Sequence, residues 1–264
     1  MKIYINTDLE GVCGFVDWEE VQTGRGIGYT KEFLTAEVNA AIEGVLTEDG
    51  GAQIVVQDGH GGGWWGPNII AEELHPRASV IFGKRGAELA GLDRGFDLMI
   101  CIGAHSMAGT QYGVMNHTIG IDSIHNVWVN GVRVGEIGIW AAIAGTYDIP
   151  LGMVSGDHWA VEEAKALLGG IEGVAVKKGV NRYAAECMNP LEARKIIKEA
   201  ARAAVSNRAQ YKPYRVKSPI ELKVEYSFTH HADKADSHSA ERLDGRTVCF
   251  RGDDFLTVYN QANL

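Results

Sequence analysis

The order of hydrophobic and polar positions along the first two-thirds of the chain predicts strands that alternate with helices. Short apolar runs at 2–7, 53–57, 97–102 and 149–154 are typical of buried strands. Residues 31–48 carry apolar side chains at helical spacing before Gly50-Gly51 ends the pattern. This alternation indicates an α/β fold with a mainly parallel sheet and helices on both faces.

Further elements follow from turn and cap residues. Apolar runs on either side of Asn130-Gly131 predict a tight hairpin. Pro190 is suited to the first turn of a helix that runs to about residue 205. Helical patterns also cover 135–144 and 160–168.

The last quarter of the chain does not continue the alternation of strands and helices. Pro213 and Pro219 bracket a basic, extended stretch, which is followed by strand patterns at 221–228 and 246–250 and the opening of a helix after 253. We therefore expect an α/β core at 1–210 and a smaller α+β segment at 211–264 that packs on it.

Composition narrows the class of protein. The chain has 264 residues, of which 45% are hydrophobic and 22% charged, as in ordinary globular domains. A formal net charge of −9 argues against nucleic acid as a partner. No apolar run approaches the length of a membrane span or a signal peptide, and the four cysteines form no CxxC pair. We expect a cytoplasmic protein that does not enter a membrane.

Residues able to bind a metal follow three of the predicted strands. Asp8 and Glu10 come after the first strand, His60 after the second and His105 after the third. In a parallel α/β sheet the carboxyl ends of the strands meet at one edge, where ligands bind. The recurrence at three strand ends favours a metal site over three separate turns or caps.

The donor set indicates which metal and how many ions. Carboxylates and imidazoles without nearby thiolates suit zinc in a reactive site rather than a closed structural one. A carboxylate that bridges two ions holds them about 3.5–4 Å apart in two-metal hydrolases. Asp8 is the candidate for that bridge.

Two further residues have chemistry that spacing alone does not assign. Glu136 begins a predicted helix, where a carboxylate is as well suited to stabilising the first turn as to binding a metal. His117 follows a glycine-containing loop and is a candidate acid, base or oxyanion stabiliser.

These motifs together resemble the zinc-dependent D-aminopeptidases of bacterial dipeptide-transport operons. The resemblance spans most of the chain and is specific in order and spacing. It rests on Asp8-Leu9-Glu10-Gly11, Asp58-Gly59-His60, Gly103-Ala104-His105, Gly113-Val114-Met115-Asn116-His117, Gly135-Glu136-Ile137-Gly138 and Val154-Ser155-Gly156-Asp157.

The resemblance implies a two-zinc site and a self-compartmentalising peptidase. Asp8 would bridge the ions and His117 would serve catalysis, while the remaining ligands would be Glu10, His60, His105 and Glu136. The substrate would be a short peptide of D-amino acids, cleaved at its N-terminal amide bond by a zinc-activated hydroxide. The family also implies a homo-oligomer, a ring of ten subunits.

The sequence departs from the family pattern near the expected substrate. Asn116 stands where a serine is expected, and Gly61-Gly62-Gly63-Trp64-Trp65 replaces a more polar stretch. Hydrolysis is therefore a firmer expectation than D-peptide preference. Two alternatives remain at this point: a two-metal phosphoesterase, which uses the same ligand types, and a non-catalytic small-molecule binding protein on the same fold.

Overall fold

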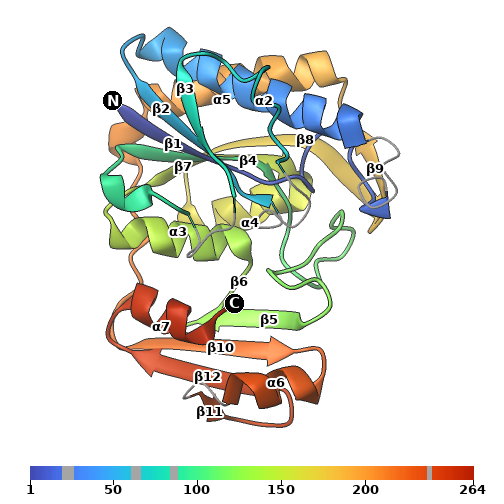
Figure 1. Ribbon diagram of the computed structural model, residues 1–264, viewed down its shortest axis with the longest axis vertical. Coiled ribbons are helices and arrows are strands. Elements are labelled where there is room, and N and C mark those ends of the chain that lie inside the picture. Colours follow the sequence, from blue (N-terminus) through green and yellow to red (C-terminus); the bar gives the residue numbers. More distant parts are fainter. Residues whose placement is uncertain (20–26, 61–66, 84–88, 237–239) are drawn as a thin grey trace.

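The main sheet has seven strands in the order β3-β2-β1-β4-β7-β8-β9 (Figure 1). The computed structural model describes residues 1–19, 27–60, 67–83, 89–236 and 240–264. Neighbouring strands are parallel except β8 and β9, which are antiparallel. The strands are β1 (Lys2–Thr7), β2 (Gln53–Asp58), β3 (Ala78–Ile81), β4 (Leu98–Ala104), β7 (Leu151–Asp157), β8 (Glu172–Asn181) and β9 (Ala184–Cys187).

Helices cover both faces of this sheet. On one face lie α2 (Ile27–Glu48) and α5 (Pro190–Ser206), and on the other α3 (Glu136–Thr146) and α4 (His158–Leu168) (Figure 1). A Cβ at Gly44 would overlap the carbonyl oxygen of Lys198, so this glycine lets α2 and α5 pack closely. Asn189 caps α5 by accepting a hydrogen bond from the backbone of Leu191 at 2.9 Å.

A second sheet, antiparallel, lies beyond α3 and has the order β11-β12-β10-β5-β6 (Figure 1). Its hairpin turns at Asn130 and Gly131, whose φ angles of 48° and 81° are those of a type I′ turn. The strands are β5 (Ile124–Val129), β6 (Val132–Val134), β10 (Ile220–Tyr226), β11 (Glu241–Arg242) and β12 (Thr247–Gly252), with helices α6 (Thr229–Asp236) and α7 (Phe255–Ala262). Two 3-10 turns, Leu92–Arg94 and Arg208–Gln210, complete the described elements.

The expected α/β fold with helices on both faces is confirmed. The second sheet takes β5 and β6 from 124–134, so the C-terminal strands pair with a segment that precedes residue 210. The division of the chain into 1–210 and 211–264 stays a prediction. Among the described helices, none combines the length and the apolar composition of a bilayer span.

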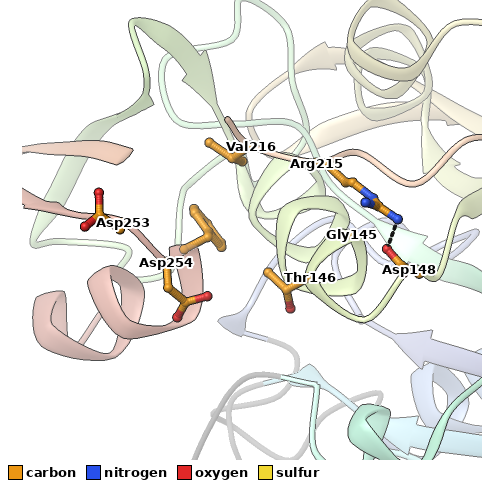
Figure 2. Close-up of a pocket in the computed structure, with 8 residues that line it drawn as sticks. Gly145, Thr146, Asp148, Arg215, Val216, Asp253 and Asp254 are labelled. Atoms are coloured by element: carbon orange, nitrogen blue, oxygen red, sulfur yellow. Dashed lines mark ion pairs between the residues drawn. The ribbon is translucent and has the colours of Figure 1, made fainter. Parts of the chain in front are cut away.

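A surface pocket lies where the segment after α5 passes between the end of α3 and the start of α7 (Figure 2). Arg215 from that segment forms an ion pair with Asp148. A Cβ at Gly145 would overlap the carbonyl oxygen of Tyr214, so the segment approaches α3 closely there. None of the predicted site residues lines this pocket.

Candidate metal centre

The parallel register of the three central strands brings the predicted ligands to one edge of the sheet. Thr7 at the end of β1 is opposite Asp58 of β2 and Ile102 of β4. The chain continues from these strand ends into Asp8, His60 and His105, all of which are buried. The predicted convergence therefore occurs.

Asp8, Glu10 and His60 form one set of possible metal ligands, which we call the Asp8 group. The Nδ1 atom of His60 lies 2.9 Å from Glu10 Oε2 and 3.2 Å from Asp8 Oδ1. The three donor atoms lie within 4.8 Å of one another, which is close enough for a single ion to contact all of them.

His105, His117 and Glu136 form a second set, the His105 group. Glu136 Oε1 lies 3.4 Å from His105 Nε2 and 3.6 Å from His117 Nε2. The two imidazole rings stack with their centroids 4.0 Å apart. The structure thus places His117, predicted as a catalytic group, where it can also act as a third ligand.

Asp8 connects the two groups. Its Oδ1 faces His60, while its Oδ2 lies 3.4 Å from His105 Nε2. A carboxylate with one oxygen toward each group has the geometry of a bridging ligand.

Buried polar atoms at this edge fit a divalent cation. Asp8 Oδ2 and His105 Nε2, which lie 3.4 Å apart, are buried and make no hydrogen bond within the described part of the chain. The Nδ1 atoms of His105 and His117 lie 3.0 and 2.9 Å from the backbone carbonyls of Ser106 and Met115. An N–H directed at a carbonyl fixes the tautomer and leaves Nε2 free as a ligand, the usual arrangement of metal-binding histidines.

Protons on the imidazoles of His60 and His105, whose pKa values the neighbouring carboxylates raise, balance part of the negative charge at the site. Burial, followed by the charge of Glu10, raises the pKa of Asp8 to about 7. Burial also favours a neutral Glu136, but the charge and hydrogen bond of His105, the charge of His117 and the backbone N–H of Ile119 together outweigh burial and lower the pKa of Glu136 to about 2. Burial opposes protonation of His60, yet Glu10 and Asp8 raise its pKa to about 10. A divalent cation would take the place of these protons and release them.

A close backbone approach and a buried lysine hold the loop that follows β1. A Cβ at Gly103, where φ is +80°, would overlap the carbonyl oxygen of Asp8. The buried ammonium group of Lys177 on β8 donates to three carbonyls of the loop, those of Glu10, Val12 and Phe15. The position of Glu10 therefore depends on a strand that carries none of the candidate ligands.

Several polar residues of the site were not singled out from the sequence. Lys177 and Trp18 offered no motif, because their contacts are made with residues far away or in an irregular loop. Glu163 on α4 accepts hydrogen bonds from the backbone of Met107 and Gly135, which adjoin the His105 group. The sequence marks Glu163 in one way only: it is a carboxylate on the helix face that carries the buried residues of α4.

The other residues of the family motifs have supporting positions. Asp58 accepts hydrogen bonds from the backbone of Asn68 and Ile69, so it anchors the chain beyond His60. Asp157 is buried and accepts a hydrogen bond from Ser106 at 3.3 Å. The segment Gly61-Gly62-Gly63-Trp64-Trp65 lies outside the described residues.

Comparison with known proteins identifies the family. The D-aminopeptidase family matches residues 1–264. The chain belongs to this family. A D-aminopeptidase of Bacillus subtilis (strain 168) is 32% identical over 269 residues, a match that covers 100% of this chain and 96% of the relative.

A solved structure agrees with this assignment to the D-aminopeptidase family. The Zn-dependent D-aminopeptidase DppA from Bacillus subtilis, described as a self-compartmentalizing protease, superposes with a TM-score of 0.92 at 31% identity. The match covers 99% of this chain and 95% of that one. The comparisons favour a peptidase over the phosphoesterase and the non-catalytic binding protein.

Proposed function

We propose that this D-aminopeptidase family member binds two zinc ions and cleaves the N-terminal amide bond of short peptides, with preference for D-amino acids. The observation that carries the proposal is the pair of ligand groups joined by Asp8, with donors oriented by backbone carbonyls. The names of the relatives supply the zinc and the D-peptide preference.

The donor chemistry supports zinc. The two groups offer imidazole nitrogens and carboxylate oxygens, a mixture suited to a borderline cation. When bound, zinc supplies Lewis acidity that polarises a carbonyl and acidifies water. We assign Asp8 as the bridge, with Glu10 and His60 on one ion and His105 and Glu136 on the other.

His117 is assigned to proton transfer rather than to zinc. Its Nδ1 lies 2.9 Å from the Met115 carbonyl, so Nε2 faces the site with its lone pair available. From that position the imidazole accepts a proton and delivers it to the leaving amine, or stabilises the tetrahedral oxyanion in its protonated form. Such roles are worth roughly a hundredfold or more in rate.

The substrate assignment is tested with matched L- and D-amino-acid p-nitroanilides and dipeptides. Turnover is measured before chelation, after chelation and after zinc is restored. We expect cleavage of D-substrates that disappears with the chelator and returns with zinc. Chelator-sensitive cleavage of L-peptides alone would contradict the stereochemical preference, and a zinc-loaded protein inactive on every peptide would contradict the aminopeptidase assignment.

Zinc analysis of His117→Ala separates the two roles open to this histidine. If His117 transfers protons, the variant keeps two zinc ions per chain and loses at least about a hundredfold in kcat. Loss of one zinc ion would identify His117 as a ligand instead. Normal turnover with both ions bound would remove it from the mechanism altogether.

We also infer that the chain assembles with copies of itself into a closed ring, ten subunits being the expected number. The support is the description of DppA as a self-compartmentalizing protease. Light scattering after size-exclusion chromatography tests this, since the expected mass is ten times that of one chain and a monomer would refute the inference. The cytoplasmic location stays a prediction.

A further inference from the structure

Trp18 contacts both ligand groups with one side chain. Its indole Nε1 donates a hydrogen bond of 2.7 Å to Glu10 Oε1, in the Asp8 group. Its ring lies edge-to-face with His117 of the His105 group, with centroids 5.4 Å apart and the planes at 78°. The half-buried tryptophan therefore spans the two groups.

The hydrogen bond from Trp18 uses the one Glu10 oxygen that does not face His60. Glu10 Oε2 lies 2.9 Å from His60 Nδ1, while Oε1 receives the indole N–H. A carboxylate held at one oxygen by a fixed donor presents the other in a defined direction. Outer hydrogen bonds of this kind orient metal ligands in many proteins.

The guanidinium group of Arg182 lies over the ring of Trp18. The guanidinium carbon lies 5.4 Å from the centroid of the indole ring, within the range of a cation–π contact. The same side chain donates to the backbone carbonyl of Asn116 and, at 3.1 Å, to the Asn116 side-chain oxygen. Because Asn116 precedes His117, Arg182 connects the tryptophan to the backbone that carries this histidine.

The backbone of Arg182 strengthens this connection. Its carbonyl accepts a hydrogen bond from the backbone N–H of Met115 at 2.8 Å. Met115 in turn supplies the carbonyl that faces His117 Nδ1. The turn between β8 and β9 thus holds His117 through two consecutive residues, and it contacts the Trp18 ring twice, through the guanidinium of Arg182 and through the ring of Tyr183, whose centroid lies 6.3 Å from that of the indole.

We propose that Trp18, clamped by Arg182, is a positioning residue that orients Glu10 toward one zinc ion and fixes the ring plane of His117. This inference rests on the proposed function, because it assigns Glu10 to zinc and His117 to proton transfer. Neither Trp18 nor Arg182 needs to touch the metal. Their effect reaches the reaction through the two side chains that they hold.

The experiment compares Trp18→Phe with the wild type in the assembled protein. Phenylalanine keeps an aromatic ring and removes the N–H. We expect zinc binding, measured by competition with a chromogenic chelator, to weaken about 10- to 100-fold for one of two ions. Trp128→Phe is the matched control, because Trp128 lies on β5 in the second sheet, and it should leave zinc affinity unchanged.

Arg182→Gln tests the clamp separately. The variant loses the cation–π contact with Trp18 and the charged guanidinium group that donates to the Asn116 carbonyl. It keeps the hydrogen bond from the Trp18 N–H to Glu10. We expect kcat with zinc saturating to fall several-fold while zinc affinity changes much less than in Trp18→Phe. Equal losses of zinc affinity in the two variants would contradict the division of roles in which Trp18 orients Glu10 and Arg182 supports His117.

The outcomes distinguish this inference from the proposed function. A wild-type protein that binds no zinc overturns the proposed function, and the positioning role falls with it. A wild type that binds zinc and cleaves peptides, together with a Trp18→Phe variant of equal zinc affinity and kcat, overturns the positioning role alone. If Trp18→Phe fails to fold, Arg182→Gln decides: a several-fold fall in kcat with zinc saturating is expected, and an unchanged kcat overturns the positioning role.

Discussion

Replacement of Lys177 by methionine tests how the loop carrying Glu10 is held. The Lys177 ammonium group is buried and donates to the carbonyls of Glu10, Val12 and Phe15, the second at 2.9 Å. Methionine has a similar length and no donor. Lys177→Met therefore leaves three backbone acceptors without the partner that they have in the native protein.

The expected loss follows from these acceptors. A buried acceptor left without its partner costs about 1–3 kcal/mol, so the Glu10 and Phe15 carbonyls together cost about 2–6 kcal/mol, whereas the Val12 carbonyl keeps the backbone N–H of Phe15 at 3.3 Å. Burial also lowers the pKa of Lys177, which means that the charged form is destabilised by desolvation, and methionine removes this penalty. We expect a net loss of about 2 kcal/mol in the free energy of unfolding, or roughly 4–8 °C in Tm for a chain of this size.

The assay is urea or thermal unfolding of the zinc-free protein, followed by zinc titration. Lys178→Met is the matched control, since Lys178 is the next residue of β8 and its side chain is exposed. We expect the control to change stability by less than about 0.5 kcal/mol and to bind zinc normally. Equal stability and equal zinc affinity of the two variants would refute the reasoning.

Three further predictions address the backbone, a thiol and the metal. Gly103→Ala should cost at least about 2 kcal/mol more than Gly109→Ala in unfolding measurements, because both glycines have positive φ but only Gly103 faces an obstacle, the Asp8 carbonyl. A hydrogen bond from Cys13 lowers the pKa of Cys187 to about 6, so its alkylation by iodoacetamide should rise through pH 6 and level off near neutrality; a midpoint near 9 would contradict this. Zinc at a hundredfold excess over its Kd should stabilise the fold by about 2.7 kcal/mol in thermal-shift measurements. Asp8→Asn should lose most of that gain, and an equal gain would exclude the bridging role.

The convergence of the candidate ligands was predictable because strand order determines where they lie. Asp8, His60 and His105 each follow an apolar run, and parallel strands place their carboxyl ends at one edge. The residue types, carboxylates and imidazoles without thiolates, then favour a reactive zinc site. Neither step requires knowledge of side-chain packing, so the sequence was sufficient for both.

The supporting residues were beyond the sequence because their roles come from tertiary contacts. Lys177 and Glu10 are 167 positions apart, and Arg182 lies 66 positions from Asn116. The strand β8 was itself missed, since its charged residues and glycines interrupt the apolar pattern. The second sheet shows the same limit, because β10 pairs with β5 about a hundred residues earlier.

These contacts meet at the loop after β1, and they explain how the position of a candidate ligand can depend on distant strands. The loop supplies Asp8 and Glu10, while Gly103 lets β4 approach it and Lys177 holds its carbonyls from β8. Glu37 on α2 accepts the backbone N–H of Cys13 at 3.0 Å and anchors it from a third element. Irregular backbone positions a ligand accurately only when its polar groups are paired. Zinc affinity should therefore respond to substitutions on β8 even though this strand contributes none of the candidate ligands.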